Sequence, residues 1–262
     1  MCGIAGYSLH RASRIDRTLA AQALLAGIAE RGADAVGYAY RGDGESLSVH
    51  KQRTGASALI ERVSIPSDAT QALIHVRDYT KGHPRIEANN HPVRHGVVKG
   101  VHNGIIVNDE ELFARHDFAR EQPRMTVDSE AIFALVDAKG SAAKALEELR
   151  GSMAAAWFDD RRPEVFLARG VGRPLWLGEG RREAFFASTK DALEVVERYL
   201  GLRLRKRELP EGILLSLLDG KRSAAERFRP DRAFEETPLP AVRAPHEGAV
   251  CLRRLAAIAA SY

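Results

Sequence analysis

The sequence predicts an α+β sandwich, and three observations lead to that class. Many short apolar segments with strand character follow one another through short turns, while few segments have helical periodicity. The 262 residues suffice for one large domain with a full core, and 45% apolar and 28% charged residues are typical of a globular protein. Strands and helices do not alternate regularly, which argues against a doubly wound parallel sheet.

Apolar periodicity places the first elements along the chain. A strand is expected over residues 4–9, and a helix over 14–29, with Ser13 as its N-cap and Gly32 after its end. The stretch 77–95 is poor in aliphatic residues and rich in Gly, Pro and Asn, so we expect a long functional loop there. Further strands are expected at 36–40, 47–51, 72–76, 97–102, 153–158, 165–169, 175–177, 184–187 and 213–218.

Turn and capping residues set the remaining boundaries. The strand at 97–102 is expected to end at Asn103-Gly104, a turn signal. One helix is expected to begin after Asp128 and another at the capping sequence Ser188-Thr189-Lys190-Asp191. The basic run 203–207 alternates like an exposed edge strand, with a surface for an acidic partner or nucleic acid as the alternative.

The sequence divides into an expected domain over 2–232 and a tail over 233–262. The tail contains Pro238, Pro240 and Pro245, a composition typical of a linker, before apolar residues at helical spacing over 249–260. We expect this terminal helix to pack on its own domain; docking to a partner protein is the alternative.

Composition excludes several classes of function. No run approaches the roughly 18–20 apolar residues of a membrane span, and the N-terminus lacks a secretory signal, so no membrane association is expected. Cys2 and Cys251 make no disulfide framework and indicate a cytoplasmic protein. A net charge of +4 is too small to predict a nucleic-acid partner. The histidines between residues 75 and 102 match no zinc spacing, so we expect no metal and no cofactor.

Cys2 is the most informative single residue. It directly follows Met1, and removal of Met1 by an aminopeptidase would leave Cys2 with a free α-amino group beside its thiol. An α-amine titrates near about 8, so part of it is neutral at pH 7 and can take the proton of the thiol. One residue would then supply both a nucleophile and its general base.

Several motifs accompany Cys2 in sequence order. Met1-Cys2-Gly3-Ile4-Ala5-Gly6-Tyr7 resembles the opening of class II glutamine amidotransferase domains, the N-terminal-nucleophile glutaminases. The further segments similar to that family are Arg31-Gly32-Ala33-Asp34-Ala35-Val36-Gly37, His75-Val76-Arg77 with Thr80 and Gly82, Asn89-Asn90-His91-Pro92, Val101-His102-Asn103-Gly104-Ile105-Ile106 and Val127-Asp128-Ser129-Glu130. Two weaker matches lie at 151–154 and 169–175. The resemblance covers roughly residues 2–218.

The resemblance implies a fold and a chemistry. The fold is a four-layer αββα sandwich of two mainly antiparallel sheets between helices. Cys2 would attack the side-chain amide of L-glutamine, release ammonia and leave a γ-glutamyl thioester that water hydrolyses to glutamate. By the same resemblance, the Asn103 side-chain amide and the Gly104 backbone N–H would stabilise the oxyanion, an effect worth a few kcal/mol per donor.

The resemblance also implies the residues that select the substrate. Arg77 would bind the α-carboxylate, for which its planar guanidinium is suited. Asp128 would bind the α-ammonium group, although it could also cap the helix that follows. Thr80 and His91 would complete the substrate site.

One segment departs from the family pattern, which is commonly Arg-Trp-x-Thr-His. Here it reads Arg77-Asp78-Tyr79-Thr80-Lys81, so two charged residues change the polarity of the loop over glutamine. The departure leaves two alternatives to a glutaminase. The same Cys2 chemistry could hydrolyse a γ-glutamyl amide conjugate, or the chain could be an inactive glutaminase-like regulatory or binding subunit.

The family passes its ammonia to a synthase domain. Because few residues follow the glutaminase-like part, the sequence predicts a separate ammonia-using synthase subunit, with the tail as one docking candidate. Assembly into a homo-oligomer stays open.

Overall fold

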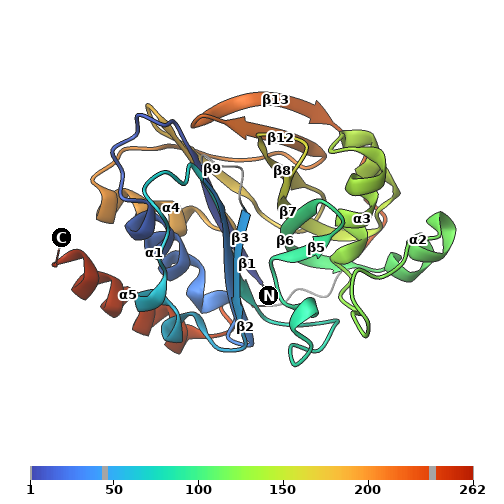
Figure 1. Ribbon diagram of the computed structural model, residues 1–262, viewed down its shortest axis with the longest axis horizontal. Coiled ribbons are helices and arrows are strands. Elements are labelled where there is room, and N and C mark those ends of the chain that lie inside the picture. Colours follow the sequence, from blue (N-terminus) through green and yellow to red (C-terminus); the bar gives the residue numbers. More distant parts are fainter. Residues whose placement is uncertain (1, 43–46, 236–239, 262) are drawn as a thin grey trace.

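In the computed structural model, which describes residues 2–42, 47–235 and 240–261, two sheets pack face to face between helices (Figure 1). The first sheet contains β1 (Gly3–Leu9), β2 (Ala35–Arg41), β3 (Leu47–Gln52), β4 (Gln71–Arg77), β9 (Trp176–Glu179), β10 (Glu183–Ala187) and β11 (Arg205–Glu208). The second contains β5 (Val93–His95), β6 (Val98–Ile106), β7 (Gly151–Asp159), β8 (Val165–Arg169), β12 (Ile213–Leu218) and β13 (Lys221–Arg227). The α-helices are α1 (Arg17–Ile28), α2 (Asp109–His116), α3 (Glu130–Lys139), α4 (Lys190–Leu200) and α5 (Pro245–Ala259). The 3-10 turns are η1 (Ala29–Arg31), η2 (Ala56–Ala58), η3 (Ile60–Arg62), η4 (Glu87–Asn89) and η5 (Ala143–Glu148).

Both sheets are antiparallel throughout their named strand pairs. The first sheet has the strand order β11-β9-β10-β1-β4-β2-β3, and the second has the order β13-β12-β8-β7-β6-β5. In Figure 1, α1, α4 and α5 lie on one side of the sheet pair, and α2 and α3 lie on the other. The expected four-layer α+β sandwich is confirmed, and with it the edge strand expected at the basic run, which is β11.

Three apolar cores hold the layers together. One lies between the two sheets, the second between the first sheet and α1, α4 and α5, and the third between the second sheet and its helices. The core between the sheets includes Ile4, Leu73 and Val101. The core against α1, α4 and α5 includes Tyr7, Leu24 and Leu255, and the core under the helices of the second sheet includes Phe133, Leu135 and Trp157. Because strand side chains alternate between faces, Ile4 faces the other sheet while Ala5 and Tyr7 face the helices.

The first helix begins three residues later than expected, and Ser13 is not its cap. Asp16 is the N-cap, and its carboxylate accepts the Leu19 N–H at 2.7 Å. The Ser13 hydroxyl instead donates to the Glu183 carboxylate at 2.7 Å. Aspartate caps a helix as well as serine does, and the Ser13 hydroxyl is engaged in a tertiary contact instead.

The strand that becomes β6 does not end at Asn103-Gly104, as the turn signal predicted. It continues to Ile106, and its partner β7 pairs Asn103 with Ala154 and Gly104 with Met153. The long ladder with β7 therefore outweighs the local turn preference of these two residues.

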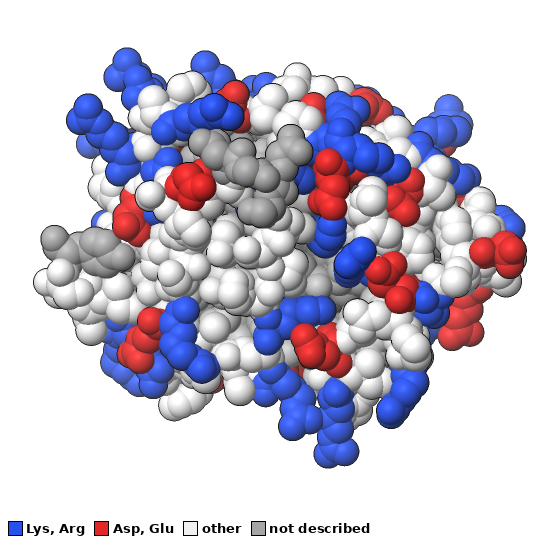
Figure 2. Space-filling view, viewed as in Figure 1, with Lys and Arg blue, Asp and Glu red and all other residues white. Residues whose placement is uncertain are grey.

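The tail ends in α5, which packs against α1 and η1. Cys251 and Leu255 are fully buried in the core on that side, and the Glu247 carboxylate accepts two hydrogen bonds from Ser57, at 2.7 and 2.9 Å. Part of the expected linker, residues 237–239, lies outside the described residues. None of the helices within the described ranges is both long and apolar enough to cross a membrane. Figure 2 shows one face of the molecule, on which basic and acidic side chains are interspersed.

Candidate active site

Cys2, Arg77 and Asn103 reach the gap between the two sheets at the same end of the sandwich. The β1–β4 register pairs Gly3 with Val76, and one step further along it Cys2 lies opposite Arg77. Side chains two or four residues apart on a strand point to the same face. Cys2 therefore points like Ile4, Arg77 like Leu73 and Asn103 like Val101, and these three apolar residues face the core between the sheets. The two sheets therefore present Cys2, Arg77 and Asn103 to one another.

The Cys2 side chain is half-buried and is held from two sides. Its sulfur lies 3.4 Å from the Asp78 carbonyl oxygen, and its own carbonyl oxygen accepts a hydrogen bond from Arg31 Nε at 2.9 Å. Loss of water around the sulfur raises the thiol pKa, and the nearby Arg77 guanidinium partly offsets this effect. The thiol is therefore predominantly protonated near neutral pH, and a nucleophilic reaction needs a base to take its proton.

Arg77 ends β4 as a nearly fully buried guanidinium. Its Nη1 donates to the Asn90 side-chain oxygen at 2.6 Å, and its Nη2 donates to the backbone oxygens of Lys81, at 2.9 Å, and Gly82. Burial lowers the Arg77 pKa, which the electrostatic influence of Cys2 and then Asp128 opposes. The loop after β4 therefore folds back over the Arg77 guanidinium, the group that the resemblance predicts to bind substrate.

Asn103 and Gly104 lie in the middle of the β6–β7 ladder. The Asn103 side chain is buried, yet neither its amide nitrogen nor its oxygen has a hydrogen-bond partner among the described residues. Gly104 has φ +146°, and a Cβ atom there would lie 2.0 Å from the Ser152 carbonyl oxygen. Buried polar groups are normally paired, so the free Asn103 amide is a candidate donor for a bound ligand.

Asp128 is buried just before α3 and does not cap that helix with a described hydrogen bond. Its carboxylate instead accepts the Ile106 N–H of β6 at 2.7 Å. Burial raises its pKa to about 6, against the opposing effect of the Ile106 hydrogen bond. Asp128 is therefore a carboxylate at neutral pH that titrates within reach of ordinary assay conditions.

Three buried histidines connect the two sheets beside this site. His75 Nε2 on β4 lies 3.1 Å from the His102 carbonyl oxygen on β6, and the His91 ring stacks on His75 at 4.1 Å between centroids. His102 in turn is held by the Ser129 hydroxyl, at 2.8 Å, and the Ser152 carbonyl, at 3.3 Å. Burial lowers the pKa of His75 and of His102 to about 3, and that of His91 well below its usual value. These rings are neutral at pH 7 and connect the strands rather than exchange protons with solvent.

The structure brings six of the seven residues predicted for the site to this end, and leaves Thr80 outside the buried group. Cys2, Arg77, His91, Asn103, Gly104 and Asp128 all lie on strands or loops that meet here. Thr80 is exposed on the loop after β4. His91 has no hydrogen-bond partner for either ring nitrogen among the described residues.

Sequence reasoning missed two sets of contacts at this site. One is Asn90 as the partner of Arg77, which the Asn89-Asn90-His91-Pro92 motif could have suggested. The other is a salt bridge from Lys81 to the buried Asp109, at 2.8 Å, which also involves the exposed Glu110 at 3.2 Å. The salt bridge joins segments that are 28 residues apart, so no local sequence pattern predicts it.

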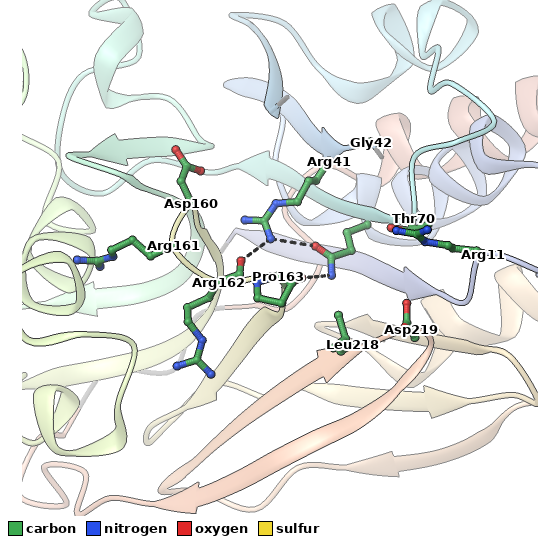
Figure 3. Close-up of a pocket in the computed structure, with 11 residues that line it drawn as sticks. Arg11, Arg41, Gly42, Thr70, Asp160, Arg161, Arg162, Pro163, Leu218 and Asp219 are labelled. Carbon is green, nitrogen blue, oxygen red and sulfur yellow. Dashed lines mark hydrogen bonds between the residues drawn. The ribbon is translucent and has the colours of Figure 1, made fainter. Parts of the chain in front are cut away.

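A cavity lies at the opposite end of the sandwich. It has a volume of about 450 Å³, and the residues that line it include Arg41 and Gln71 (Figure 3). Arg41 ends β2 and Gln71 begins β4, and the opposite ends of these two strands lie near Cys2. Arg41 donates there to the Arg162 carbonyl at 2.7 Å, and Gln71 donates to the Pro163 carbonyl at 2.7 Å. β4 spans seven residues, so roughly 20 Å separates this cavity from the Cys2 end. Within the described residues, no three His, Cys, Asp or Glu side chains group as metal ligands.

Comparison with known proteins matches residues 83–195 to the family described as "Glutamine amidotransferase domain". This match includes Asn103, Gly104 and Asp128 but begins after Cys2 and Arg77. The chain is 33% identical over 216 residues to glutamine–fructose-6-phosphate aminotransferase (isomerizing) of Shigella flexneri, and 33% identical over 217 residues to that of Escherichia coli K12. Each alignment covers 76% of this chain and 33% of the relative, so the chain spans about a third of these proteins.

A solved structure supports the same fold. Glutamine phosphoribosylpyrophosphate amidotransferase from B. subtilis, complexed with ADP and GMP, superposes with a TM-score of 0.66 at 23% identity. The superposition covers 87% of this chain and 49% of that chain. The N-terminal-nucleophile hydrolase fold is therefore confirmed for the sandwich.

Proposed function

Because this chain belongs to the class II glutamine amidotransferase domain family, we propose that it hydrolyses L-glutamine to glutamate and ammonia through Cys2. The observation that carries the proposal is the buried Asn103 amide next to Gly104, which has no hydrogen-bond partner among the described residues. It lies at the end of the sandwich where Cys2 and Arg77 meet. An amide nitrogen left without a partner suits a site that acquires its acceptor only when a substrate oxyanion forms.

The proposed reaction needs a free α-amine on Cys2. Met1 lies outside the described residues, and its removal is part of the proposal. The amine takes the proton of the thiol, and the sulfur attacks the side-chain carbonyl carbon of glutamine. Asn103 and the Gly104 N–H donate to the oxyanion. The tetrahedral intermediate collapses, the amine returns the proton to the leaving nitrogen, and ammonia departs. Water, deprotonated by the same amine, then cleaves the γ-glutamyl thioester and releases glutamate.

Substrate selection is assigned to two opposite charges, Arg77 at the end of β4 and Asp128 just before α3. Arg77 would bind the α-carboxylate with the guanidinium N–H groups that remain beside its three hydrogen bonds to Asn90, Lys81 and Gly82. Asp128 would bind the α-ammonium group, and its buried position makes an unpaired carboxylate costly in the absence of that partner. His91 and Thr80 are proposed as further substrate contacts.

The fate of the ammonia is a separate proposal. The described residues form the sandwich and the helix α5 packed on it, so an ammonia-using synthase would lie outside them. We place it on a separate subunit in the cytoplasm, where a free cysteine nucleophile suits a reducing environment. Affinity capture of the full chain tests this, and its isolation free of partners with full glutaminase activity would count against it.

The proposed nucleophile is tested by intact mass spectrometry before and after treatment with 6-diazo-5-oxo-norleucine, a glutamine-mimicking electrophile. We expect a protein without Met1 that gains one adduct, mapped to Cys2, and loses glutaminase activity in step with labelling. Cys2→Ser should take no adduct at that position. A retained Met1 with no adduct would contradict an active glutaminase and favour the regulatory or binding subunit.

A substrate panel separates glutamine from γ-glutamyl conjugates. The two charged residues that raised this alternative both have protein partners: Asp78 pairs with Arg243 at 3.0 Å, and Lys81 pairs with Asp109. Because Asp78 and Lys81 each form an ion pair within the protein, their charges are not left over to bind a larger substrate. We therefore expect glutamine to be turned over faster than larger γ-glutamyl amides at equal concentration. The reverse ranking would establish the conjugate hydrolase instead.

A further inference from the structure

The segment before α5 contacts the loop that follows β4, although 165 residues separate the two in the sequence. Arg243 Nε lies 3.0 Å from the Asp78 carboxylate. The same segment is fixed by its backbone, since the N–H groups of Arg243 and Ala244 donate to the Glu30 carbonyl oxygen at 2.9 and 2.8 Å. The arginine is therefore presented by an anchored backbone rather than by a free end.

The tail segment contacts one residue that holds Cys2 and the neighbour of the other. The backbone oxygen of Asp78, whose side chain meets Arg243, lies 3.4 Å from the Cys2 sulfur. Glu30, which anchors the tail segment, precedes Arg31, whose Nε donates to the Cys2 carbonyl at 2.9 Å. The tail segment thus supports both sides of the proposed nucleophile.

The loop over residues 78–82 is also anchored elsewhere. The Tyr79 N–H donates to the Asp34 carboxylate at 2.9 Å, and Lys81 forms its ion pair with Asp109. At the end of this loop, the carbonyl oxygens of Lys81 and Gly82 accept hydrogen bonds from the Arg77 guanidinium. These hydrogen bonds orient the guanidinium, so the conformation of this loop sets how Arg77 is presented to a substrate carboxylate.

We propose that Arg243 is a positioning residue for glutamine binding: through Asp78 it stabilises the loop conformation over Cys2 and Arg77. This inference rests on the proposed glutaminase function. Arg243 touches neither the sulfur nor the substrate-binding groups directly, so its effect falls on glutamine affinity and not on the chemical step. The C-terminal segment then becomes part of the glutamine site, and anything that displaces it weakens substrate binding.

The size of the effect follows from the exposure of the pair. The side chains of Arg243 and Asp78 are 41% and 21% exposed, so water and salt screen their attraction. Losing such a pair shifts the population of a loop conformation by about two- to fivefold. We expect that change in the KM for glutamine, with kcat unaltered, and a weaker salt dependence of KM once the pair is gone.

The experiment compares Arg243→Ala with Arg243→Lys and with Arg254→Ala in the full chain. Arg254 is the matched control, because it also ties the tail to the domain, through the Ser57 carbonyl at 2.6 Å, without contacting the loop after β4. Two readouts are taken: KM and kcat for glutamate release, and amide hydrogen exchange of the peptide spanning residues 78–82 without glutamine.

Arg243→Ala should raise KM by about two- to fivefold and accelerate exchange in that peptide, with Lys restoring part of both and Arg254→Ala changing neither. Unchanged KM and exchange in Arg243→Ala would overturn the proposal, as would an equal effect of Arg254→Ala or a fall in kcat alone. If the wild-type protein, freed of Met1, does not hydrolyse glutamine, the proposed function fails, and the exchange data still decide whether Arg243 orders the loop.

Discussion

The binding role proposed for Asp128 carries a cost in stability, because burial raises its pKa to about 6. A carboxyl whose pKa is raised in the folded state contributes most to stability when protonated, below its unfolded pKa near about 4. That contribution is lost as the pH rises through 6, so the ionised group destabilises the protein at pH 7. The charge is retained at this cost for a partner that the described residues do not supply, which fits the α-ammonium group of the substrate.

Asp128→Asn should therefore stabilise the protein while weakening glutamine binding. The amide retains an oxygen for the Ile106 N–H and removes a buried charge, so we expect a gain of about 1–3 kcal/mol in the free energy of unfolding at pH 7. The gain should vanish below about pH 4, and the KM for glutamine should rise about tenfold or more. Urea unfolding at both pH values and steady-state kinetics measure this.

The control for that experiment is Asp68→Asn, at an exposed carboxylate, which should alter neither quantity. In the wild type, KM should rise as the pH falls through 6, because protonated Asp128 cannot attract an ammonium group, and this rise should be absent in Asp128→Asn. A loss of stability at pH 7 would contradict the charge argument.

Residue types at this site were predictable where the chemistry demands them. The proposed nucleophile, the arginine proposed for the substrate carboxylate and an asparagine beside a glycine stand out in the sequence. The structure brings Cys2, Arg77 and Asn103 to one end of the sandwich. Partners that act through tertiary contact were not predictable. Arg243 is one of many surface arginines until the fold places it against Asp78.

At the scale of elements, β6 shows how the ladder overrides a local signal. Gly104 adopts φ +146° within a continuous strand, and its backbone approaches the Ser152 carbonyl so closely that a Cβ would lie 2.0 Å from that oxygen. The Asn-Gly pair that predicted a turn is explained by this close approach and by the proposed use of the Gly104 N–H.

Gly104→Ala is expected to shift β6 away from β7 and to abolish turnover. The added methyl clashes with backbone, which moves less readily than a side chain, so we expect a loss of about 2–4 kcal/mol in the free energy of unfolding. The matched control is Gly140→Ala, which also has positive φ, +81°, but no atom within 4 Å of the new Cβ. It should cost about 1 kcal/mol and leave activity intact.

Chemical denaturation of both variants, with glutamine turnover measured on the folded fraction, decides between a steric and a purely conformational origin. Equal losses in the two variants would show that positive φ alone makes Gly104 necessary.

Strands and helices with strong periodicity were predictable, and weakly patterned ones were not. The Thr189 cap of α4 is present as expected, since its side chain accepts the Ala192 N–H at 3.3 Å. α2 went unnoticed because it buries only two apolar side chains, Leu112 and Phe113. β13 is exposed along its whole length, so it has no alternating pattern, and pairing with β12 alone makes it a strand.

Across the whole molecule, the two ends of the sandwich have different tasks. At the Cys2 end, buried polar groups of Asn103 and His91 have no partners among the described residues. At the far end, polar groups join the sheets: Arg41 of the first sheet donates to the Arg162 and Asp159 carbonyls beside the second, at 2.7 and 3.1 Å. This difference agrees with the proposed glutamine site at one end, while the contacts at the other end join the two sheets.

Arg41→Met should destabilise the protein without altering the chemistry. It retains an apolar stem beside Phe158, over which the guanidinium now lies at 4.8 Å, but removes the donor to the Arg162 carbonyl and one of the two donors to the Asp159 carbonyl, which keeps the Arg162 N–H. We expect a loss of about 2–4 kcal/mol in the free energy of unfolding, measured by urea denaturation. Because Arg41 lies roughly 20 Å from Cys2, kcat/KM for glutamine should stay within about twofold of the wild type.

The control is Arg53→Met, at an exposed arginine, which should change neither the free energy of unfolding nor kcat/KM. A large fall in kcat/KM with little loss of stability would instead show that the far end acts on the site, and that the sandwich does not separate support from catalysis.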